Sequence, residues 1–194
     1  MTPAKHRLPR NTAVASRQGG FTLMELMIVI VLVALMATLG VPAYRQQVLN
    51  SQMTSNANDL LATFHSARSE AVGRQNLVTA CPSNVAGDDC SGSSWEDGWI
   101  MFEDLNGNAA VDSGEEILFE RAGLTTPGTI RGTTQIAAGL TFRPNGTTDL
   151  TSTQTIVVCD DRGFGSDARG IIVTVVGHAS SLEATDTAVA SCTP

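Results

Sequence analysis

The feature that most constrains this chain is an apolar run near its N-terminus. Residues 21–41 contain a single charged side chain, that of Glu25. At 1.5 Å per residue, a helix of this length spans about 31 Å, which is enough to cross a bilayer. The run therefore predicts a transmembrane helix over residues 21–41, in which an inserted carboxylate costs about 2.5 to 3.5 kcal/mol.

The segment before this run is basic and polar. Residues 1–20 contain no acidic residue and four basic ones, which are Lys5, Arg7, Arg10 and Arg17. Because basic residues stay on the cytoplasmic side, the N-terminus is predicted to be cytoplasmic and the head of the protein periplasmic. The expected topology is that of a single-pass protein of the bacterial inner membrane.

Two simpler interpretations exist for the same residues, namely an ordinary signal peptide and a plain membrane anchor. Residues 41–43, Val-Pro-Ala, resemble a small-residue cleavage site. The apolar run is longer than the about 7 to 15 residues that are usual for a signal-peptide core, and Pro42 fits such a site poorly. Neither interpretation explains Glu25 or the Gly-Gly-Phe-Thr sequence at residues 19–22.

The junction at residues 20–26, Gly-Phe-Thr-Leu-Met-Glu-Leu, is followed by apolar residues and Pro42. This pattern resembles the class III leader and N-terminal helix of type IV pilins and pseudopilins. The resemblance implies that residues 1–20 are a leader, which prepilin peptidase removes by cutting between Gly20 and Phe21 before methylating the amine of Phe21. It also implies a subunit that stays in inner-membrane lipid until it joins other pilins or pseudopilins in a filament.

Cleavage would give Glu25 a charged partner. The new amine of Phe21 is positive, and a neighbouring subunit could bring it against Glu25, which offsets the burial cost of both charges only upon assembly. The amine of the same chain, four residues away on the same helix face, is the alternative partner. Phe21 and Glu25 are thus the predicted assembly residues.

A long amphipathic segment follows the apolar run. Small and apolar residues recur there at three- and four-residue steps, which predicts a helix with one face against a core. Pro42 is expected to kink this helix and Gly73 to end it, so that residues 42–74 extend the first helix to about 50 residues. The predicted core-facing residues are Met53, Ala57, Leu60, Leu61, Phe64, Ala67 and Ala71.

After residue 75 the pattern changes to short segments rich in β-branched and aromatic residues, with no further helical period. Such segments predict strands, so residues 75–194 form a β-rich head. The predicted fold class is α+β, in which the long helix packs on an antiparallel sheet or pair of sheets, as the pilin resemblance also implies. Residues 178–194 are predicted to be a polar tail. The predicted strands are residues 77–81, 99–103, 117–121, 140–143, 155–160 and 170–176.

Four cysteines lie in this head, Cys81, Cys90, Cys159 and Cys192. An even number outside the cytoplasm predicts disulfides, and four cysteines allow three connectivities. We favour Cys81–Cys90, which closes a short loop rich in Gly, Asp and Asn, and Cys159–Cys192, which ties the tail to a strand. A metal site is disfavoured because no C-x-x-C pair is present and the histidines lack ligand spacing to the cysteines.

Several head segments resemble the GspH/FimT group of minor pilins and pseudopilins. The resemblance implies a low-abundance subunit near the tip of a type IV pilus or of a type II secretion pseudopilus, which helps to initiate or cap the filament. One chain does not decide between the two systems. The matching segments are residues 64–71 (FHSARSEA), 95–102 (WEDGWIMF), 104–108 (DLNGN), 142–146 (FRPNG) and 159–163 (CDDRG).

Some pilus members of this group bind DNA, so a DNA-binding tip module for natural transformation is the alternative from another functional class. The candidate residues are Arg162 and Arg169, although acidic residues surround both. Leader removal takes away four of the 12 basic residues and none of the 19 acidic ones, so the net charge falls from −7 to −11. DNA binding is therefore disfavoured, since phosphate neutralisation dominates such affinity.

An acidic segment of the head matches part of a calcium-binding loop. Its oxygen-bearing residues fall at positions that supply ligands in such a loop, but Ala109 stands where a Gly is expected. Calcium binding and a solvated acidic hairpin loop are both open, and no other metal or cofactor is expected. The candidate calcium ligands are Asp104, Asn106, Asn108, Asp112 and Glu115.

No motif supports catalysis. His65 and His178 lack a nucleophile or a carboxylate at catalytic spacing, and there is no Gly-rich phosphate loop. We therefore expect a structural subunit and not an enzyme. Once assembled, the subunit would belong to a cell-surface filament.

Overall fold

The structure, a computed structural model, describes residues 20–125, 127–186, 189, 191 and 192. The predicted leader therefore lies outside the described residues, except for Gly20. The chain divides into two compact units, residues 1–44 and residues 45–194, and the division falls inside the first helix.

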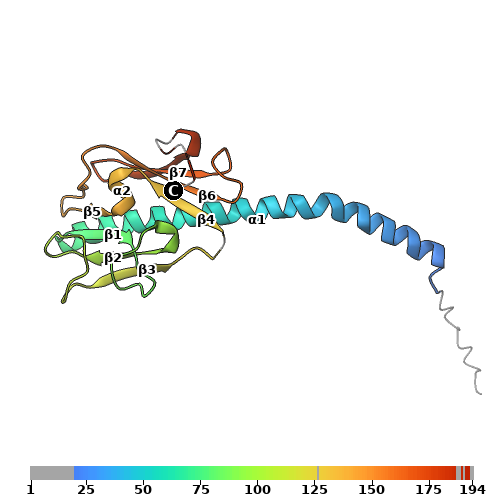
Figure 1. Cartoon of the computed structure of the whole chain (residues 1–194), viewed down its shortest axis with the longest axis horizontal. Helices are drawn as coiled ribbons and strands as arrows, with labels where there is room; N and C mark the ends of the chain where they lie inside the picture. The colour runs from blue at the N-terminus through green and yellow to red at the C-terminus, as the bar shows by residue number, and fades with distance from the viewer. Residues whose placement is uncertain (1–19, 126, 187–188, 190, 193–194) are drawn as a thin grey trace, which may run out of the picture. The chain divides into compact units, whose positions relative to one another are not determined.

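Helix α1 spans Leu23–Arg74 and is 52 residues long (Figure 1). The hydroxyl of Thr22 accepts a hydrogen bond from the backbone N–H of Glu25 at 3.2 Å, which satisfies one of the N–H groups left without a partner at a helix start. Pro42 lies within the helix. Gln75 follows the last turn with a φ of +60°, the left-handed conformation that commonly ends a helix. The predicted long helix is present and ends one residue beyond the predicted stop.

The second half of α1 packs into the head along one face. The predicted stripe is buried, apart from Leu61, which is half-buried against the same core. Thr63 is buried although it is polar, and its hydroxyl has one hydrogen-bond partner in the head and one in α1 itself. It accepts a hydrogen bond from Nε1 of Trp99 at 2.9 Å and donates one to the carbonyl of Asp59 at 2.9 Å.

Two four-stranded antiparallel sheets lie on either side of this half of α1 (Figure 1). The first sheet has the order β3-β2-β1-β5 and contains β1 (Val78–Pro82), β2 (Gly98–Glu103), β3 (Ile117–Ala122) and β5 (Leu140–Phe142). The second sheet has the order β4-β6-β7-β8 and contains β4 (Gly128–Gly132), β6 (Gln154–Asp160), β7 (Arg169–Val173) and β8 (Ala179–Glu183). The predicted α+β pilin fold is confirmed, with a pair of sheets.

Five of the six predicted strands match observed strands to within one residue at each end. The sixth, β7, ends at Val173 and not at residue 176. The reason is a turn, in which the N–H of Gly177 donates to the carbonyl of Thr174 at 2.9 Å. Gly177 has a φ of +79° there, a conformation that residues with a Cβ rarely adopt.

Three elements of the head escape the sequence pattern. The prediction that residues 178–194 form a polar tail is wrong for β8, and the prediction of no further helix is wrong for α2 (Thr134–Ala138). β4 was missed as well. The strands β4 and β8 each contain one large apolar residue, Ile130 and Leu182, so their sequences carry little strand signal. Each is a strand because it pairs over five residues with β6 or β7.

The core is built around three aromatic side chains, Phe64, Trp95 and Trp99, all of them buried. Phe64 and Trp95 meet edge to face with 5.8 Å between ring centres. Trp95 also donates its Nε1–H to the carbonyl of Ile136 at 3.0 Å, which attaches α2 to the core. Both tryptophans therefore combine apolar burial with a satisfied N–H group.

Both disulfides have the connectivity favoured from the sequence. Cys81–Cys90 joins β1 to the loop that follows it, across a sequence separation of 9. Cys159–Cys192 joins β6 to the C-terminal segment, across a separation of 33. The hydroxyl of Thr129 donates to the carbonyl of Cys192 at 2.9 Å, so this segment is also held against β4.

Candidate functional sites

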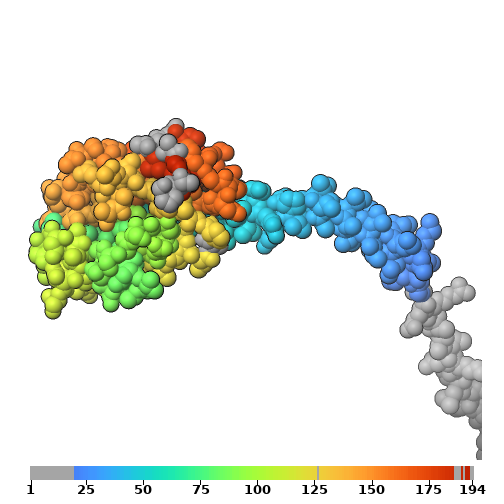
Figure 2. All heavy atoms as spheres, in the orientation of Figure 1, coloured from blue at the N-terminus to red at the C-terminus, as the bar shows by residue number. Residues whose placement is uncertain are grey.

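The first unit presents a continuous apolar surface. Every residue from Gly20 to Tyr44 is exposed, and Phe21 exposes 82% of its surface (Figure 2). Among the described residues, α1 is the one helix that is long and apolar enough to cross a membrane. An apolar surface of this extent marks contact with lipid or with other protein chains.

Glu25 carries the one charge on this surface. It lies in the first turn of α1, where an acidic side chain interacts favourably with the helix dipole. Its side chain is exposed, and no ion pair of its carboxylate is found within the described part of the chain. Gly20 and Phe21 are exposed just before this turn. Both residues lie about one helical turn from Glu25 in the sequence.

Asp104 organises the acidic loop from beneath the surface. Its side chain is fully buried, and its carboxylate accepts a hydrogen bond from the hydroxyl of Thr79 at 2.8 Å. The same carboxylate accepts the N–H groups of Gly107 at 2.7 Å, Asn108 at 3.2 Å and Ala109 at 3.1 Å. Ala109 has a φ of +58°, so the chain makes its sharp turn without the expected Gly. Both oxygens of Asp104 are therefore occupied by donors of the protein itself.

The other candidate calcium ligands also bind groups of the same loop. Asp112 accepts the side-chain amides of Asn106 at 2.8 Å and Asn108 at 2.7 Å, and these bonds lower the pKa of Asp112. Glu115 accepts the N–H of Leu105 at 2.8 Å and that of Asp112 at 2.9 Å. The described residues contain no group of three or more His, Cys, Asp or Glu side chains arranged to hold a metal ion. The geometry favours the hairpin-loop interpretation.

Arg162 ties the connection between β6 and β7 to helix α1. Its Nη2 donates to Asp160 at 2.6 Å, and its Nε lies 3.0 Å from the same carboxylate oxygen. Its Nη1 donates to side-chain oxygens of Gln46 at 3.0 Å and Asn50 at 2.8 Å, and lies 3.3 Å from Asp167. The hydrogen bond to Asp160 is the main cause of the raised pKa of Arg162. The sequence pattern does not reveal the two helix partners, which lie more than a hundred positions away.

Arg169, the second candidate for nucleic-acid binding, also contacts other residues of the head. Its Nη1 lies within hydrogen-bonding distance of three backbone carbonyls, those of Ser166, Asp167 and Ala168, at 3.0 to 3.3 Å. The structure therefore brings Arg162 and Arg169 into internal contacts and does not combine them into a basic surface.

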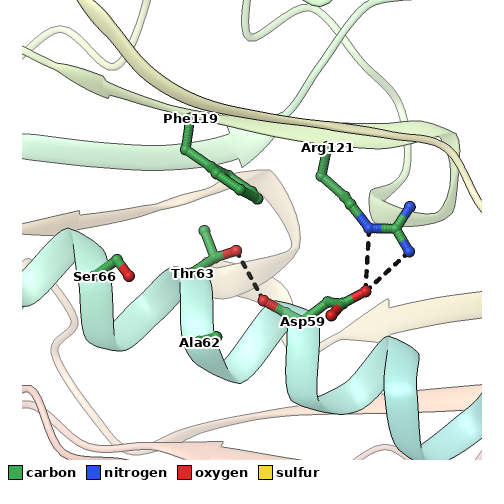
Figure 3. A pocket seen from close by; sticks show the side chains of 6 residues that line it. All are labelled: Asp59, Ala62, Thr63, Ser66, Phe119 and Arg121. Atoms are coloured by element: carbon green, nitrogen blue, oxygen red, sulfur yellow. Dashed lines mark hydrogen bonds and ion pairs between the residues drawn. The ribbon is translucent and has the colours of Figure 1, made fainter.

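A pocket of about 240 Å³ lies between α1 and β3 (Figure 3). Asp59 of α1 and Arg121 of β3 form an ion pair at one side of it, with Nη2 and Nε of the arginine 3.0 and 3.2 Å from Oδ2 of the aspartate. The guanidinium carbon of Arg121 lies 5.4 Å from the ring centre of Trp99, which adds a cation–π contact. Phe119 points from β3 toward the helix. Sequence reasoning missed this pocket because Asp59 and Arg121 are 62 positions apart and belong to no motif.

An apolar N-terminal helix that continues into a head of two antiparallel sheets defines the class of pilin-like proteins. In agreement, the fold is similar to two crystal structures of the type IV minor pilin FimU from Pseudomonas aeruginosa (strain PAO1). The first has a TM-score of 0.59 and 20% sequence identity, and the similarity covers 74% of this chain and 96% of FimU. The second has a TM-score of 0.53 and 22% identity, and covers 72% and 99%. At this identity the likeness establishes the fold alone.

Residues 56–177 match the family model of the type II transport protein GspH, and the chain belongs to this family. Residues 15–41 match the prokaryotic N-terminal methylation motif, which includes Gly20, Phe21 and Glu25. The resemblance to the GspH/FimT group is thereby confirmed.

The chain is also 35% identical over 79 residues to prepilin peptidase-dependent protein D of Escherichia coli (strain K12). This match covers 40% of the chain and 47% of that protein, so the chain spans about half the length of the curated relative that it matches.

Proposed function

We propose that this chain is a minor pilin of a type IV pilus, which assembles through its N-terminal helix and helps to initiate or cap the filament. The observation that carries the proposal is the exposed apolar surface of residues 20–44, which begins with a methylation motif and contains one carboxylate. Prepilin peptidase first removes residues 1–20 and methylates Phe21. The helix then anchors the chain in the inner membrane until it joins other pilins, with its head in the periplasm.

In this mechanism Glu25 favours the assembled filament over the isolated subunit in lipid. In lipid, the carboxylate of Glu25 and the amine of Phe21 each cost free energy, because charged groups are poorly solvated there. When two subunits align, the amine of one neutralises Glu25 of the other, so the cost is removed only in the assembled filament. The competing partner is the amine of the same chain, which would make the pair a local feature of one helix.

The variants Glu25→Gln and Glu25→Ala test this step. We expect both to fold and to lose the leader normally, because Glu25 lies outside residues 45–194, which contain the core. We also expect both to remain in the membrane fraction and to be absent from sheared filaments, as measured by quantitative immunoblotting against the wild type. The matched control is Glu183→Gln, which removes an exposed carboxylate outside the membrane helix and is expected to assemble normally.

Wild-type levels of both Glu25 variants in sheared filaments would contradict a pairing between subunits. Such a result would favour the pairing within one chain. Loss of leader cleavage in the same variants would instead assign Glu25 to recognition by the peptidase.

A second candidate function is that of a minor pseudopilin in a type II secretion system, and the GspH family match favours it. The same helix and the same pairing of Glu25 would serve a periplasmic pseudopilus. A deletion strain separates the two functions. Loss of surface pili with normal protein secretion supports the pilus, and retention of secreted proteins inside the cell supports the pseudopilus.

We further propose that the head works without catalysis, cofactor or DNA binding. The ion pair of Arg162 and the internal bonds of Arg169 support the last point, together with the acidic net charge. For calcium, the loop around Asp104 is already held by its own hydrogen bonds, so we propose that it folds without the ion. We expect an unchanged melting temperature on addition of calcium or a chelator, and a calcium-dependent rise would restore the calcium-loop interpretation.

A further inference from the structure

The outer edge of β3 lacks hydrogen-bonded cover within the part of the chain that the structure describes. A strand at the edge of a sheet presents unpaired N–H and C=O groups, which can pair with another chain. Within the described residues, no backbone or side-chain hydrogen bond is found along the outer edge of β3 from Ile117 to Glu120. Only the carbonyl of Ala122, at its end, is taken by the guanidinium of Arg121, at 2.8 Å.

Two of the other edges are covered by the protein itself. On β4, the N–H of Ile130 donates to the carboxylate of Glu96 at 3.1 Å, and Thr129 binds the C-terminal segment. On β5, Thr141 exchanges two hydrogen bonds with Asp149, through its N–H at 3.1 Å and its carbonyl at 3.0 Å. These contacts block the addition of a further strand at both places.

The remaining edge, β8, is polar where β3 is apolar. Its exposed side chains are those of Ser181 and Glu183. On β3, Ile117 and Phe119 expose 37% and 39% of their surface. An edge strand that exposes large apolar side chains favours binding of another chain, because binding removes their apolar area from water.

The pocket described above opens beside this same edge and supplies room for a side chain. Ala62 and Ser66 form its helix side, and Phe119 of β3 faces them (Figure 3). Its volume of about 240 Å³ is below the range typical of small-molecule sites, so it suits one apolar side chain of a bound segment. A chain that paired with β3 would therefore find a place for a side chain next to α1.

The charges along β3 select the chemistry of the partner. The two arginines near the strand are already paired, Arg121 with Asp59 at 3.0 Å and Arg74 with Glu116 at 2.8 Å. Arg74 is also 2.8 Å from Glu70 and 3.5 Å from Glu103, so carboxylates outnumber arginines there. Glu120 is exposed without an ion pair among the described residues, and Glu116 remains 63% exposed. The edge thus carries surplus negative charge.

We propose that β3 binds an extended segment of a partner protein, which adds a fifth strand to the first sheet. The segment carries a basic side chain opposite Glu120, which faces away from α1 because its neighbours Phe119 and Arg121 face the helix. The next residue of the segment carries an apolar side chain, which faces α1 and fills the pocket. This inference goes beyond filament assembly through α1 and does not depend on it, because it uses residues of the head alone.

The test uses the full chain in a non-ionic detergent and a fluorescent peptide, Thr-Thr-Leu-Arg-Thr-Thr-Thr, with binding followed by fluorescence anisotropy. We expect saturable binding, and at least about fivefold weaker binding when glutamate replaces the arginine of the peptide. Two further peptides carry N-methyl groups on alternate backbone amides, one on the odd and one on the even residues. Strand addition predicts that one of the two loses binding and the other keeps it, because only alternate N–H groups face the sheet.

The variant Glu120→Arg is expected to weaken binding of the arginine peptide about fivefold, as the loss of an exposed ion pair can do. Glu183→Arg, on the edge of the other sheet, is the matched control and is expected to bind normally. Circular dichroism of both variants checks that they are folded. The proposal is overturned by absent binding, by equal binding of the two N-methylated peptides, by preference for the glutamate peptide, or by loss of binding in Glu183→Arg alone. Self-association of the chain that Glu120→Arg abolishes would assign the edge to a second copy and would equally overturn it.

Discussion

Arg162 joins three parts of the head through one guanidinium group. It binds Asp160 at the end of β6, lies near Asp167 before β7, and donates to Gln46 and Asn50 of α1. Only 16% of its side chain and 6% of that of Asp160 is exposed, so water screens this pair weakly. The guanidinium of Arg162 therefore holds the start of the packed half of α1 against the second sheet.

Arg162→Ala is expected to lower the free energy of unfolding by about 2 kcal/mol, because it leaves the partly buried carboxylate of Asp160 without its partner. Thermal and urea unfolding of the detergent-solubilised chain measure the change. Arg169→Ala is the matched control, because the hydrogen bonds of the Arg169 side chain to the described residues go to nearby carbonyls, and we expect it to cost less than half as much. Equal effects of the two substitutions would contradict the role given to Arg162.

The same pair predicts a dependence on pH. Burial opposes ionisation of Asp160, but the hydrogen bonds and charge of Arg162 prevail and lower the pKa of Asp160 below its ordinary value of 3.8. Folding thus favours the ionised carboxylate, and its stabilisation is complete above the ordinary pKa and is lost as the pH falls through the folded pKa. The stability difference between wild type and Arg162→Ala should be largest near neutral pH and should shrink below about pH 4. A difference that stays constant down to about pH 2 would contradict this assignment.

At the scale of elements, the two disulfides close loops of unequal length. On the loop-entropy model, Cys81–Cys90 contributes about 2.7 kcal/mol and Cys159–Cys192 about 3.8 kcal/mol. We therefore expect replacement of both cysteines by serine to lower the melting temperature more for the second pair than for the first. Differential scanning calorimetry of the two double variants measures this order. The reverse order would mean that Cys81–Cys90 also stabilises the folded state directly, for instance by holding β1, and does more than restrict the unfolded chain.

The helix and most strands could be predicted because their sequences carry their own periodicity. The stripe from Met53 to Ala71 repeats at helical spacing, and β6 contains a continuous apolar run at residues 156–159. β4, β8 and α2 could not be predicted, because their conformation depends on partners that only the fold brings together. β8, for example, is a polar pentapeptide whose pairing with β7 decides its state.

The same distinction separates the candidate sites. Gly20, Phe21 and Glu25 belong to one contiguous motif, so the sequence reveals them as a group. The contacts of Arg162 with α1 and of Arg121 with Asp59 join residues far apart in the chain, and no local pattern encodes them. Asp104 was recognised as a possible ligand, but its burial under the loop follows from the position of Thr79 in the sheet.

At the scale of the whole molecule, the two units have different surfaces. Residues 20–44 expose apolar side chains that require lipid or other helices, whereas residues 45–194 contain a complete core and two disulfides. The proposed removal of residues 1–20 would also change the net charge, from −7 to −11, because these residues include four basic side chains and no acidic one. An acidic head on an apolar helix is consistent with the proposed subunit, which passes from membrane to filament without refolding its head.

The central claim is that the chain is processed and assembled as a pilin, and the intact mass of the protein extracted from membranes tests it most directly. The account predicts a mass that corresponds to loss of residues 1–20 and gain of one methyl group at Phe21. It also predicts that the full-length mass returns in a strain without prepilin peptidase. A mass that corresponds to loss of residues 1–43, or an unprocessed chain in the wild-type strain, would contradict it.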